Sequence, residues 1–200
     1  WNFGVLLEPT EHTRLGIAYR SKVEVELGGN LASTSVVQPS TSAAVDASLP
    51  DTVLLSAYHE VDPQWAVMAD VMWTQWSRLN ALVARFGTGN TNTIPVKWED
   101  TFRYAIGASY KRDDKWTLRG GLAFDETPTP SPEFRLSALP DEDRTWLTFG
   151  AGYKHSKNLS FDFGYAHLFI DDTDINSTDA YSSAMGNPLK EGIHRITGEY

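Results

Sequence analysis

One segment near the start of the chain limits what this sequence can fold into. From Thr13 to Leu27, apolar and polar residues alternate without a break. Because successive side chains of an extended strand point to opposite faces, this segment predicts one strand with a mostly apolar wall and a small or charged wall. That strand would hold about fifteen residues, against roughly 5–6 in a soluble protein, whereas a tilted strand crosses a bilayer with about 9–11. The first hypothesis is therefore a membrane β-barrel.

The composition of the 200-residue chain narrows the possible classes. No run approaches the roughly 18 consecutive apolar residues of a transmembrane helix, which excludes a helical membrane protein. The net charge of −9 argues against a nucleic-acid partner, because phosphates require a basic face. Cysteine is absent, so disulfides, zinc–thiolate sites and thiol nucleophiles are excluded. Seven Trp, eight Tyr and nine Phe suit the aromatic belts of a barrel.

Connections of two lengths separate the predicted strands. Short turns rich in Pro, Asp, Asn and Ser join strands in pairs, and much longer connections lie between the pairs. Outer-membrane barrels show this asymmetry, with brief periplasmic turns and long outside loops, whereas a soluble sandwich has less reason for it. The short turns cover residues 8–12, 61–64, 111–114 and 155–158, and the long connections, predicted as loops, cover 28–48, 87–98, 128–143 and 173–191.

Five further segments alternate in the same way. In each, one row is apolar, and in four of the five it begins or ends in an aromatic residue beside a turn. The opposite row mixes Gly, Ala and Ser with a charge, which suits an interior shielded from lipid. The predicted fold class is all-β, a transmembrane antiparallel β-barrel with about nine strands present. Because an open sheet would leave edges in the hydrocarbon, we expect residues 1–200 to form one partial barrel domain that other strands close.

Several segments resemble one known family. The matching pieces occur in order along essentially the whole chain: WNFGVLLEP at 1–9, RLGIAYRSK at 14–22, LPD at 49–51, VDPQWA at 61–66, WTQWS at 73–77, DKWTLRGG at 114–121, FDETP at 124–128, PDEDRTWL at 140–147 and DFGY at 162–165. They resemble the long-chain fatty-acid transporters of Gram-negative outer membranes, the FadL family, together with TodX-like channels and outer membrane protein P1. Ordered similarity across so many turns is more specific than any single motif.

The resemblance implies a fourteen-stranded barrel in the outer membrane of a Gram-negative bacterium, plugged by an N-terminal hatch. This chain would supply about the sixth strand to the beginning of the last, without the hatch, the first strands and most of the last strand. We therefore expect passive transport of hydrophobic compounds through capture by outside loops, binding in the lumen and lateral release. Long-chain fatty acids are the expected substrate, and aromatic hydrocarbons are the alternative. The expected partners are this substrate and the surrounding outer-membrane lipid, and the protein is expected to be a monomer.

A fatty acid requires an apolar cavity for its tail and a cation or hydrogen-bond donors for its carboxylate. In the resembled family a lysine near the outer end helps to bind the carboxylate, and Lys97 is the nearest basic residue, although its spacing departs from the family pattern. Glu99 and Arg103 either tune this site or pair with other charges of the wall. The inward-facing residues predicted to line the cavity, or simply to fill the lumen, are Leu6, Met68, Met72, Trp76 and Trp146.

The connection at 28–48 is unusually apolar for an exposed loop. It includes Leu31, Val36 and Val37. By the resemblance, this loop forms part of an outer groove that captures the substrate, but packing onto a neighbouring loop explains the same residues. Both interpretations stay open at this point.

Other chemistries find little support in the sequence. An outer-membrane lipid hydrolase would need Ser and His in a catalytic setting, and none of the five histidines lies in a Gly-x-Ser-x-Gly or comparable motif. The segment from Asp171 to Asp174 lacks the Gly and terminal Glu of a calcium loop. We therefore expect no enzymatic activity, no catalytic residue, no metal and no cofactor.

Overall fold

The computed structural model describes residues 1–31, 41–136, 139, 141–176 and 194–196. Within these residues the chain is almost entirely β-strand, with two single-turn 3₁₀ helices, η1 (Trp76–Arg78) and η2 (Pro132–Phe134). No helix among these residues is long and apolar enough to cross a membrane.

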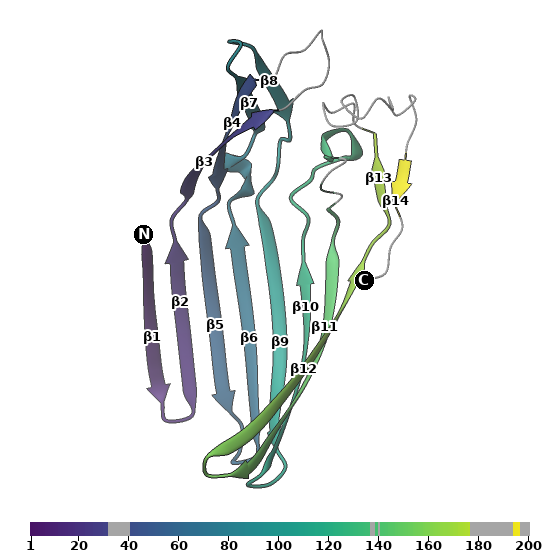
Figure 1. Ribbon diagram of the computed structural model, residues 1–200. Coiled ribbons are helices and arrows are strands. Elements are labelled where there is room, and N and C mark those ends of the chain that lie inside the picture. The colour runs from purple at the N-terminus through teal and green to yellow at the C-terminus, as the bar shows by residue number, and fades with distance from the viewer. Residues whose placement is uncertain (32–40, 137–138, 140, 177–193, 197–200) are drawn as a thin grey trace.

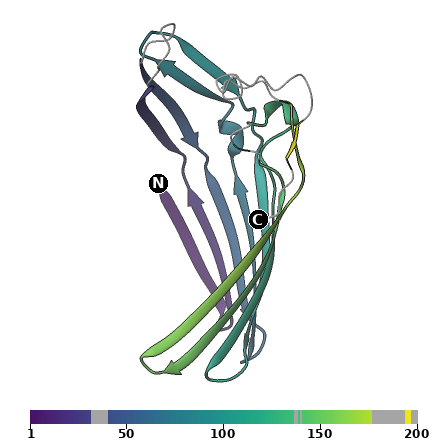
Figure 2. The same ribbon diagram turned by 45° about the vertical axis from the view of Figure 1, so that its right-hand side comes forward.

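The largest element is an eight-stranded antiparallel sheet, called the wall sheet below. Its strands lie in the order β1-β2-β5-β6-β9-β10-β11-β12, and Figures 1 and 2 show it as a curved wall with the short turns at one end. This confirms the predicted antiparallel barrel fold. The strands are β1 (Asn2–Thr10), β2 (Thr13–Arg20), β5 (Thr52–Glu60), β6 (Trp65–Thr74), β9 (Thr101–Lys111), β10 (Trp116–Asp125), β11 (Arg144–Ser156) and β12 (Leu159–Ile170).

The register of the wall sheet preserves the two faces predicted from alternation. On the outer face Val71 pairs with Leu55 and Tyr104, so apolar side chains form rows across neighbouring strands. On the inner face Met68 pairs with Gly107. A row-by-row separation of this kind is the pattern of a sheet with lipid on one side and a lumen on the other.

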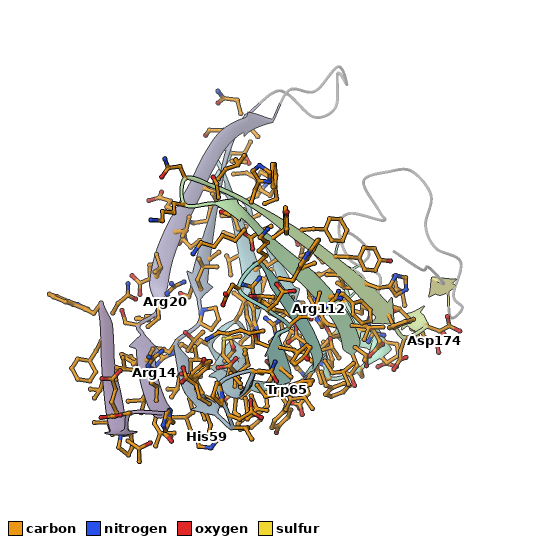
Figure 3. All side chains as sticks on the ribbon, turned by 90° about the horizontal axis from the view of Figure 1, so that it is seen from below. Arg14, Arg20, His59, Trp65, Arg112 and Asp174 are labelled. Carbon is orange, nitrogen blue, oxygen red and sulfur yellow. The ribbon has the colours of Figure 1, made fainter. Side chains whose placement is uncertain are left out.

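Aromatic pairs mark the outer face beside the short turns. The ring centroids of Trp65 and Tyr110 lie 4.6 Å apart, and those of Trp116 and Tyr153 lie at the same distance. Each Trp is the first residue of its strand, directly after a turn. Figure 3, viewed from the turn end of the sheet, labels Trp65 at this position. The rows form the aromatic belt expected at a membrane interface.

Two of the short turns share one capping device. The Oδ1 atom of Asp62 accepts hydrogen bonds from the backbone N–H groups of Gln64 and Trp65 at 2.7 and 2.8 Å. Asp113 does the same for Lys115 and Trp116, both at 2.8 Å, and these two bonds hold the pKa of Asp113 below its usual value. The repeated Asp-x-x-Trp motif thus closes a turn and starts the next strand with an interfacial Trp.

Four neighbouring wall strands break at their outer ends and continue into a second sheet, called the cap sheet. Strands β2, β5, β6 and β9 continue as β3 (Val23–Leu31), β4 (Thr41–Leu49), β7 (Ala81–Phe86) and β8 (Thr91–Pro95), and the order β3-β4-β7-β8 repeats that of the wall. Figure 1 shows the cap sheet above the wall, opposite the short turns. The β13 (Thr173–Ile175) and β14 (His194–Ile196) strands form a separate pair.

The cap sheet corrects two predictions. The segment Thr13 to Leu27 is not one strand, because it breaks at Ser21 and Lys22 and its second half joins a different sheet. The long connections at 28–48 and 87–98 are not plain loops, because their described residues include the end of β3, most of β4 and the whole of β8. Alternation continues through the break, which is why the sequence pattern does not reveal it.

The side chain of Asp51 holds the break together. Its Oδ1 atom accepts hydrogen bonds from the Tyr19 hydroxyl at 2.6 Å and the Lys22 backbone N–H at 3.0 Å, and Arg78 forms an ion pair with the same carboxylate. The Asp51 backbone carbonyl accepts a bond from the Gln75 N–H at 2.9 Å. Asp51 is only 4% exposed. Its bonds to Lys22 and Gln75 join its own break, between β4 and β5, to the breaks that follow β2 and β6.

A small apolar core lies beside the fourth break. Leu79, Val96 and Leu136 are buried against one another, and Leu82, Ile94 and Trp98 pack onto them. Leu136 belongs to the connection between β10 and β11, so this cluster joins the cap sheet to that connection.

We expect the Asp51→Asn substitution in the full-length protein to loosen the cap sheet while the wall sheet stays folded. Asparagine keeps the size of the side chain but leaves Arg78 without its anion, and breaking a nearly buried pair by removing one partner is destabilising. Amide hydrogen exchange in β3 and β4 should quicken and exchange in β10 and β11 should not. Asp46→Asn is the control, because Asp46 forms an exposed pair with Arg85, and such pairs contribute little.

The same interaction predicts a pH dependence. The hydrogen bond from Tyr19 is the main cause that holds the pKa of Asp51 below its usual value. A lowered folded-state pKa contributes stability that is complete above the unfolded value of about 3.9 and is lost as the pH falls through the lowered value. Cap exchange, corrected for intrinsic rates, should be constant from pH 7 to 5 and rise below pH 4. An equal rise in Asp51→Asn would contradict this assignment.

Candidate functional site

A cavity of about 470 Å³ lies on the inner face at the outer end of the wall sheet. Its lining residues lie at the outer ends of β6, β9, β10 and β11 and in the connections next to these ends. The lining combines apolar and charged side chains: Met72, Thr74, Trp76, Trp98, Thr101, Arg103, Asp125, Glu126, Pro128, Leu139, Asp141 and Arg144. Such a mixture of mostly apolar walls and a few polar groups is characteristic of ligand sites.

Buried hydrogen-bond donors without acceptors gather around this cavity. Among the residues that the structure describes, four buried nitrogen atoms lack a partner: Nε1 of Trp98, Nε of Arg103, Nε of Arg144 and Nε1 of Trp146. Trp98, Arg103 and Arg144 line the cavity. The fourth residue, Trp146, stacks on Arg103, whose guanidinium carbon lies 5.3 Å from the centroid of the Trp146 ring. Since buried polar groups are normally satisfied, four convergent donors indicate a place for an acceptor-rich group.

Arg103 and Arg144 differ in their surroundings. The guanidinium of Arg144 pairs with Asp125 and with Asp141, each at 3.3 Å, so its charge is largely compensated within the wall. Arg103 instead stacks on Trp146, lines the cavity and has a buried Nε without a hydrogen-bond partner. Arg103 is therefore the cation of this site that is best placed to receive an anion from outside.

Two neighbouring cavities extend the site along the inner face. One, of about 460 Å³, shares Arg103 and runs past Met68 and Trp146 over a floor of Gly and Ala. The other, of about 860 Å³, shares Met72, Thr74 and Trp76 and is lined farther on by Leu54, Val23 and Leu49. The charged end thus adjoins mostly apolar space in two directions.

The cap sheet presents an apolar face that leads into the largest of these cavities. Its pairs on this face are Val23 with Leu49, Val25 with Ala47, Leu27 with Val45, Val45 with Ala84 and Leu82 with Ile94. The opposite face carries Glu24, Glu26, Asp46 and Arg85. Because Val23 and Leu49 line the same cavity as the inward-facing Leu54 and Met72, the apolar cap face is continuous with the inner face of the wall.

A buried arginine stabilises the connection between β10 and β11 beside the first cavity. Arg135 donates to the backbone carbonyls of Asp141 at 2.9 Å and Asp174 at 2.7 Å, and to the Glu142 carboxylate at 2.5 Å. Burial raises the pKa of Glu142, although Arg135 acts in the opposite direction. These bonds hold the connection that carries Leu139 and Asp141 over the cavity.

Apart from Lys97 and Glu99, the predicted site residues fall into three groups. Met72, Trp76 and Arg103 line the first cavity, and Met68 and Trp146 line its neighbour together with Arg103. Leu6 shares the inner face, where it pairs with Gly16, but it lies at the sheet edge, 64% exposed and outside these cavities. Val36, Val37 and the side chain of Leu31 lie outside the described residues.

Lys97 and Glu99 stand beside the cavity rather than in its lining. The Lys97 ammonium lies 4.5 Å from the centroid of the Phe134 ring, and the Glu99 backbone N–H donates to the Pro128 carbonyl at 2.8 Å. Lys97 has a φ of +46° and occupies the bend between β8 and β9. Its backbone N–H donates to the Asn80 carbonyl at 3.0 Å, so this residue shapes the fourth break.

The sequence interpretation missed Trp98, Arg144 and the apolar cap residues Val23 and Leu49. Trp98 follows Lys97 directly, and a Trp outside any alternating segment was an available signal. Arg144 pairs with Asp125 and Asp141 within the wall and also lines the cavity. Alternation alone places Val23 on the lipid-facing wall, because the pattern does not mark the break between β2 and β3.

An antiparallel wall with an aromatic-edged apolar outer face and a partly charged lumen defines an outer-membrane β-barrel. The chain belongs to the family described as outer membrane protein transport protein (OMPP1/FadL/TodX), whose model matches residues 1–195. It lies accordingly in the outer membrane of a Gram-negative bacterium, as the recognised resemblance predicted.

Relatives and solved structures agree with this family. The chain is 38% identical over 172 residues to outer membrane protein P1 of Haemophilus influenzae, covering 84% of the chain and 37% of that protein. It is 33% identical over 191 residues to the long-chain fatty acid transport protein of Escherichia coli K12, covering 88% and 43%. The crystal structure of a Pseudomonas aeruginosa FadL homologue is 28% identical, with a TM-score of 0.79 and coverage of 88% and 45%.

The CymD monoaromatic hydrocarbon channel shares the fold at 24% identity, with a TM-score of 0.62 and coverage of 85% of this chain and 46% of that one. The chain therefore spans less than half the length of each of these proteins.

We expect the backbone at position 97 to discriminate sharply between substitutions. A left-handed conformation costs an ordinary residue roughly 1–2 kcal/mol, and β-branched residues tolerate it least. Because lysine already carries this cost, Lys97→Val should destabilise the full-length protein further, but by less than that amount, whereas Lys97→Gly should be neutral or stabilising. Urea titration of the folded barrel measures both. Lys111→Val, the same change at the end of the extended strand β9, is the control, and equal effects at the two positions would contradict the role of Lys97 as a bend residue.

Proposed function

We propose that the full-length protein carries long-chain fatty acids passively across the outer membrane, and that the cavity around Arg103 binds the carboxylate. The observation that supports this most directly is the cluster of four unsatisfied buried donors at one end of connected apolar cavities. A fatty acid has the matching shape, since one end accepts several hydrogen bonds and the remainder is a flexible apolar chain.

Magnitudes favour the fatty acid over an aromatic hydrocarbon. An unsatisfied buried donor costs about 1–3 kcal/mol, and a hydrogen bond to a charged group contributes about 1.5–3 kcal/mol. A hydrocarbon would occupy the apolar space but leave the donors of Trp98, Arg103 and Trp146 without acceptors. The edge-to-face pair of Trp76 and Trp98, with centroids 5.1 Å apart, gives an aromatic ligand a packing surface, so the hydrocarbon stays the alternative.

Capture is the step that we assign to the apolar face of the cap sheet. Leu27 and Leu49 are 60% and 48% exposed on this face, and Val23 and Leu49 lead into the 860 Å³ cavity. A hydrophobic molecule that binds to this face can reach the lumen without passing over the charged face of the cap sheet. For the described part of the segment 28–48, packing onto a neighbouring segment stays the alternative, because Ala43 to Asp46 pair with β7.

Release is the step that we assign to other parts of the barrel. Neighbouring strands of the wall sheet pair continuously from β1 to β12, and the register shifts of the wall sheet, at Leu7/Thr10 and Lys154/Ser156, lie beside short turns. A lateral opening is therefore proposed for strands beyond this wall.

We propose transport without catalysis and assign no catalytic role to the following histidines. His59 and His167 pair across strands with Val67 and Leu147 in the outer rows, away from the cavity. His12 lies in a turn, 3.5 Å from Glu60. None of these three positions forms the Ser–His arrangement that a lipid hydrolase requires.

We expect Arg103→Gln in the full-length protein to weaken binding of palmitate at least about tenfold, the effect of losing one charged hydrogen bond. Binding of methyl palmitate, which has the same tail without the charge, should change little. Isothermal titration of both ligands measures the difference. Arg14→Gln is the matched control, because Arg14 is an inward-facing arginine that pairs with Glu8 at 3.2 Å, stacks on Tyr58 and lies outside all three cavities.

Two outcomes would contradict the carboxylate assignment. Equal losses for palmitate and its methyl ester would show that Arg103 supports the cavity without reading the charge. Unchanged palmitate binding in Arg103→Gln, together with a loss in Lys97→Gly, would return the role to Lys97, since glycine removes the ammonium without straining the bend.

Capture is tested on the cap sheet. We expect Leu27→Asp to slow palmitate uptake into cells at limiting concentration, because a charge interrupts the apolar face, while equilibrium binding to the purified full-length protein stays unchanged. Ser48→Asp places the same charge on the polar face of the same sheet and is the control. Equal uptake in the two variants would contradict capture by this face.

A further inference from the structure

The outer face of the wall sheet carries a groove that the proposed transport route does not use. It has a volume of about 580 Å³ and crosses β5, β6, β9, β10 and β11. Ala57, Ala69, Ala108 and Gly120 form its floor, and Leu122 and Phe149 stand along its side. The side chains of Leu122 and Phe149 are 50% and 54% exposed, so the groove is a hollow between projecting apolar groups.

The register places this groove on the lipid-facing side. Ala69 pairs with Ala57 and Ile106, and Ala108 pairs with Val67 and Gly120, all within the outer rows. The row that contains His59, Val67, Ala108 and Gly120 is the next outer row after the interfacial Trp65 and Tyr110, and the rows beyond it continue into the level of the hydrocarbon. The strands of an outer-membrane barrel present this face to the acyl chains of the bilayer, so an acyl chain is the group available to fill the groove.

One end of the groove is polar. His59 lies there, next to the short turn at Glu60, and is labelled in Figure 3 at the turn end of the sheet. The Thr10 hydroxyl donates to Thr13 Oγ1 at 3.0 Å, and Thr13 Oγ1 lies 3.0 Å from His59 Nδ1. If the chain of donors continues in this direction, Nδ1 accepts and the imidazole proton resides on Nε2, from which it can be donated to a ligand.

We propose that this groove binds one acyl chain of a phospholipid of the periplasmic leaflet, with His59 donating to an ester or phosphate oxygen. Short turns mark the periplasmic end of such barrels, which places His59 at the level of these head groups. The polar end at the interface and the apolar floor in the hydrocarbon match the two parts of a lipid. The site is continuous with the lipid-facing belt, and small floor residues let a chain approach the backbone closely.

The test uses variants that fill the groove from the lipid side. A Cβ added at Gly120 would come no closer than 3.8 Å to the Thr148 carbonyl oxygen, so Gly120→Leu can project outward without disturbing the sheet. Ala151→Leu is the matched control: Ala151 pairs with Leu118 and Phe163 on the same face but lies outside the groove. His59→Phe keeps the ring and removes the donor.

The full-length variants are reconstituted in nanodiscs of palmitoyl-oleoyl phosphatidylethanolamine, extracted in mild detergent and examined by native mass spectrometry. Wild type and Ala151→Leu should retain one phospholipid per chain, and Gly120→Leu should lower this occupancy about tenfold, the effect of excluding roughly two methylene groups. His59→Phe should lower it as well.

Each other result overturns the proposal. Equal retention in Gly120→Leu and Ala151→Leu would show that lipid adheres to the belt without using the groove. Dimers of the wild type that Gly120→Leu dissolves would identify a second copy as the occupant. The heat-modifiable gel shift of each variant reports folding, and a double variant Ala57→Val/Ala69→Val, which fills the floor with less bulk, repeats the test if Gly120→Leu does not fold.

Discussion

The hydrogen bonds and the ion pair of Asp51 hold the bend on which the outer half of the structure depends. One carboxylate at the end of β4 is bonded to Tyr19 on β2, to the backbone at Lys22 and to Arg78 after β6, so three strands leave the wall at the same level. A strand that continued straight would have carried Val23, Val25 and Leu27 along the lipid face. The bend instead turns these residues toward the opening, where Val23 lines a cavity together with Leu54 and Met72.

The cavity lined by Arg103 has a polar end whose buried donors lower the stability of the wall when no acceptor is present. Four donors without acceptors would destabilise a wall that had no other purpose, because each loses its bonds to water without replacing them. Nearby Arg144 pairs its two terminal nitrogens with Asp125 and Asp141, although its Nε is one of these four donors. Arg144 thus has carboxylate partners within the wall, and under our proposal a ligand carboxylate supplies the partner of Arg103.

Alternation predicts the wall sheet well because the physical rule behind it is local. Every second side chain of an extended strand faces lipid, and the rows of β6, β9, β10, β11 and β12 follow the faces expected from the sequence. The break at Ser21 and Lys22 follows no such rule, since the pattern runs through it unchanged and its cause, Asp51, lies 29 residues away from Lys22. The left-handed bend at Lys97 is likewise set by the neighbouring Asn80 carbonyl, and no local signal distinguishes its side chain from a ligand-binding lysine.

An apolar row alone does not tell which molecule it contacts, and this chain uses the same kind of row for two purposes. The face containing Val23 and Leu49 and the face containing Ala69 and Ala108 differ little in composition. What separates them is the polar group at the end of each. The first leads to Arg103 and Trp98 inside the opening, whereas the second ends at His59 beside a periplasmic turn. Both arrangements place a hydrogen-bond donor where an amphiphile presents its acceptor. Under our two proposals, the position of that donor relative to the membrane decides whether the apolar surface receives a transported acid or a resident lipid.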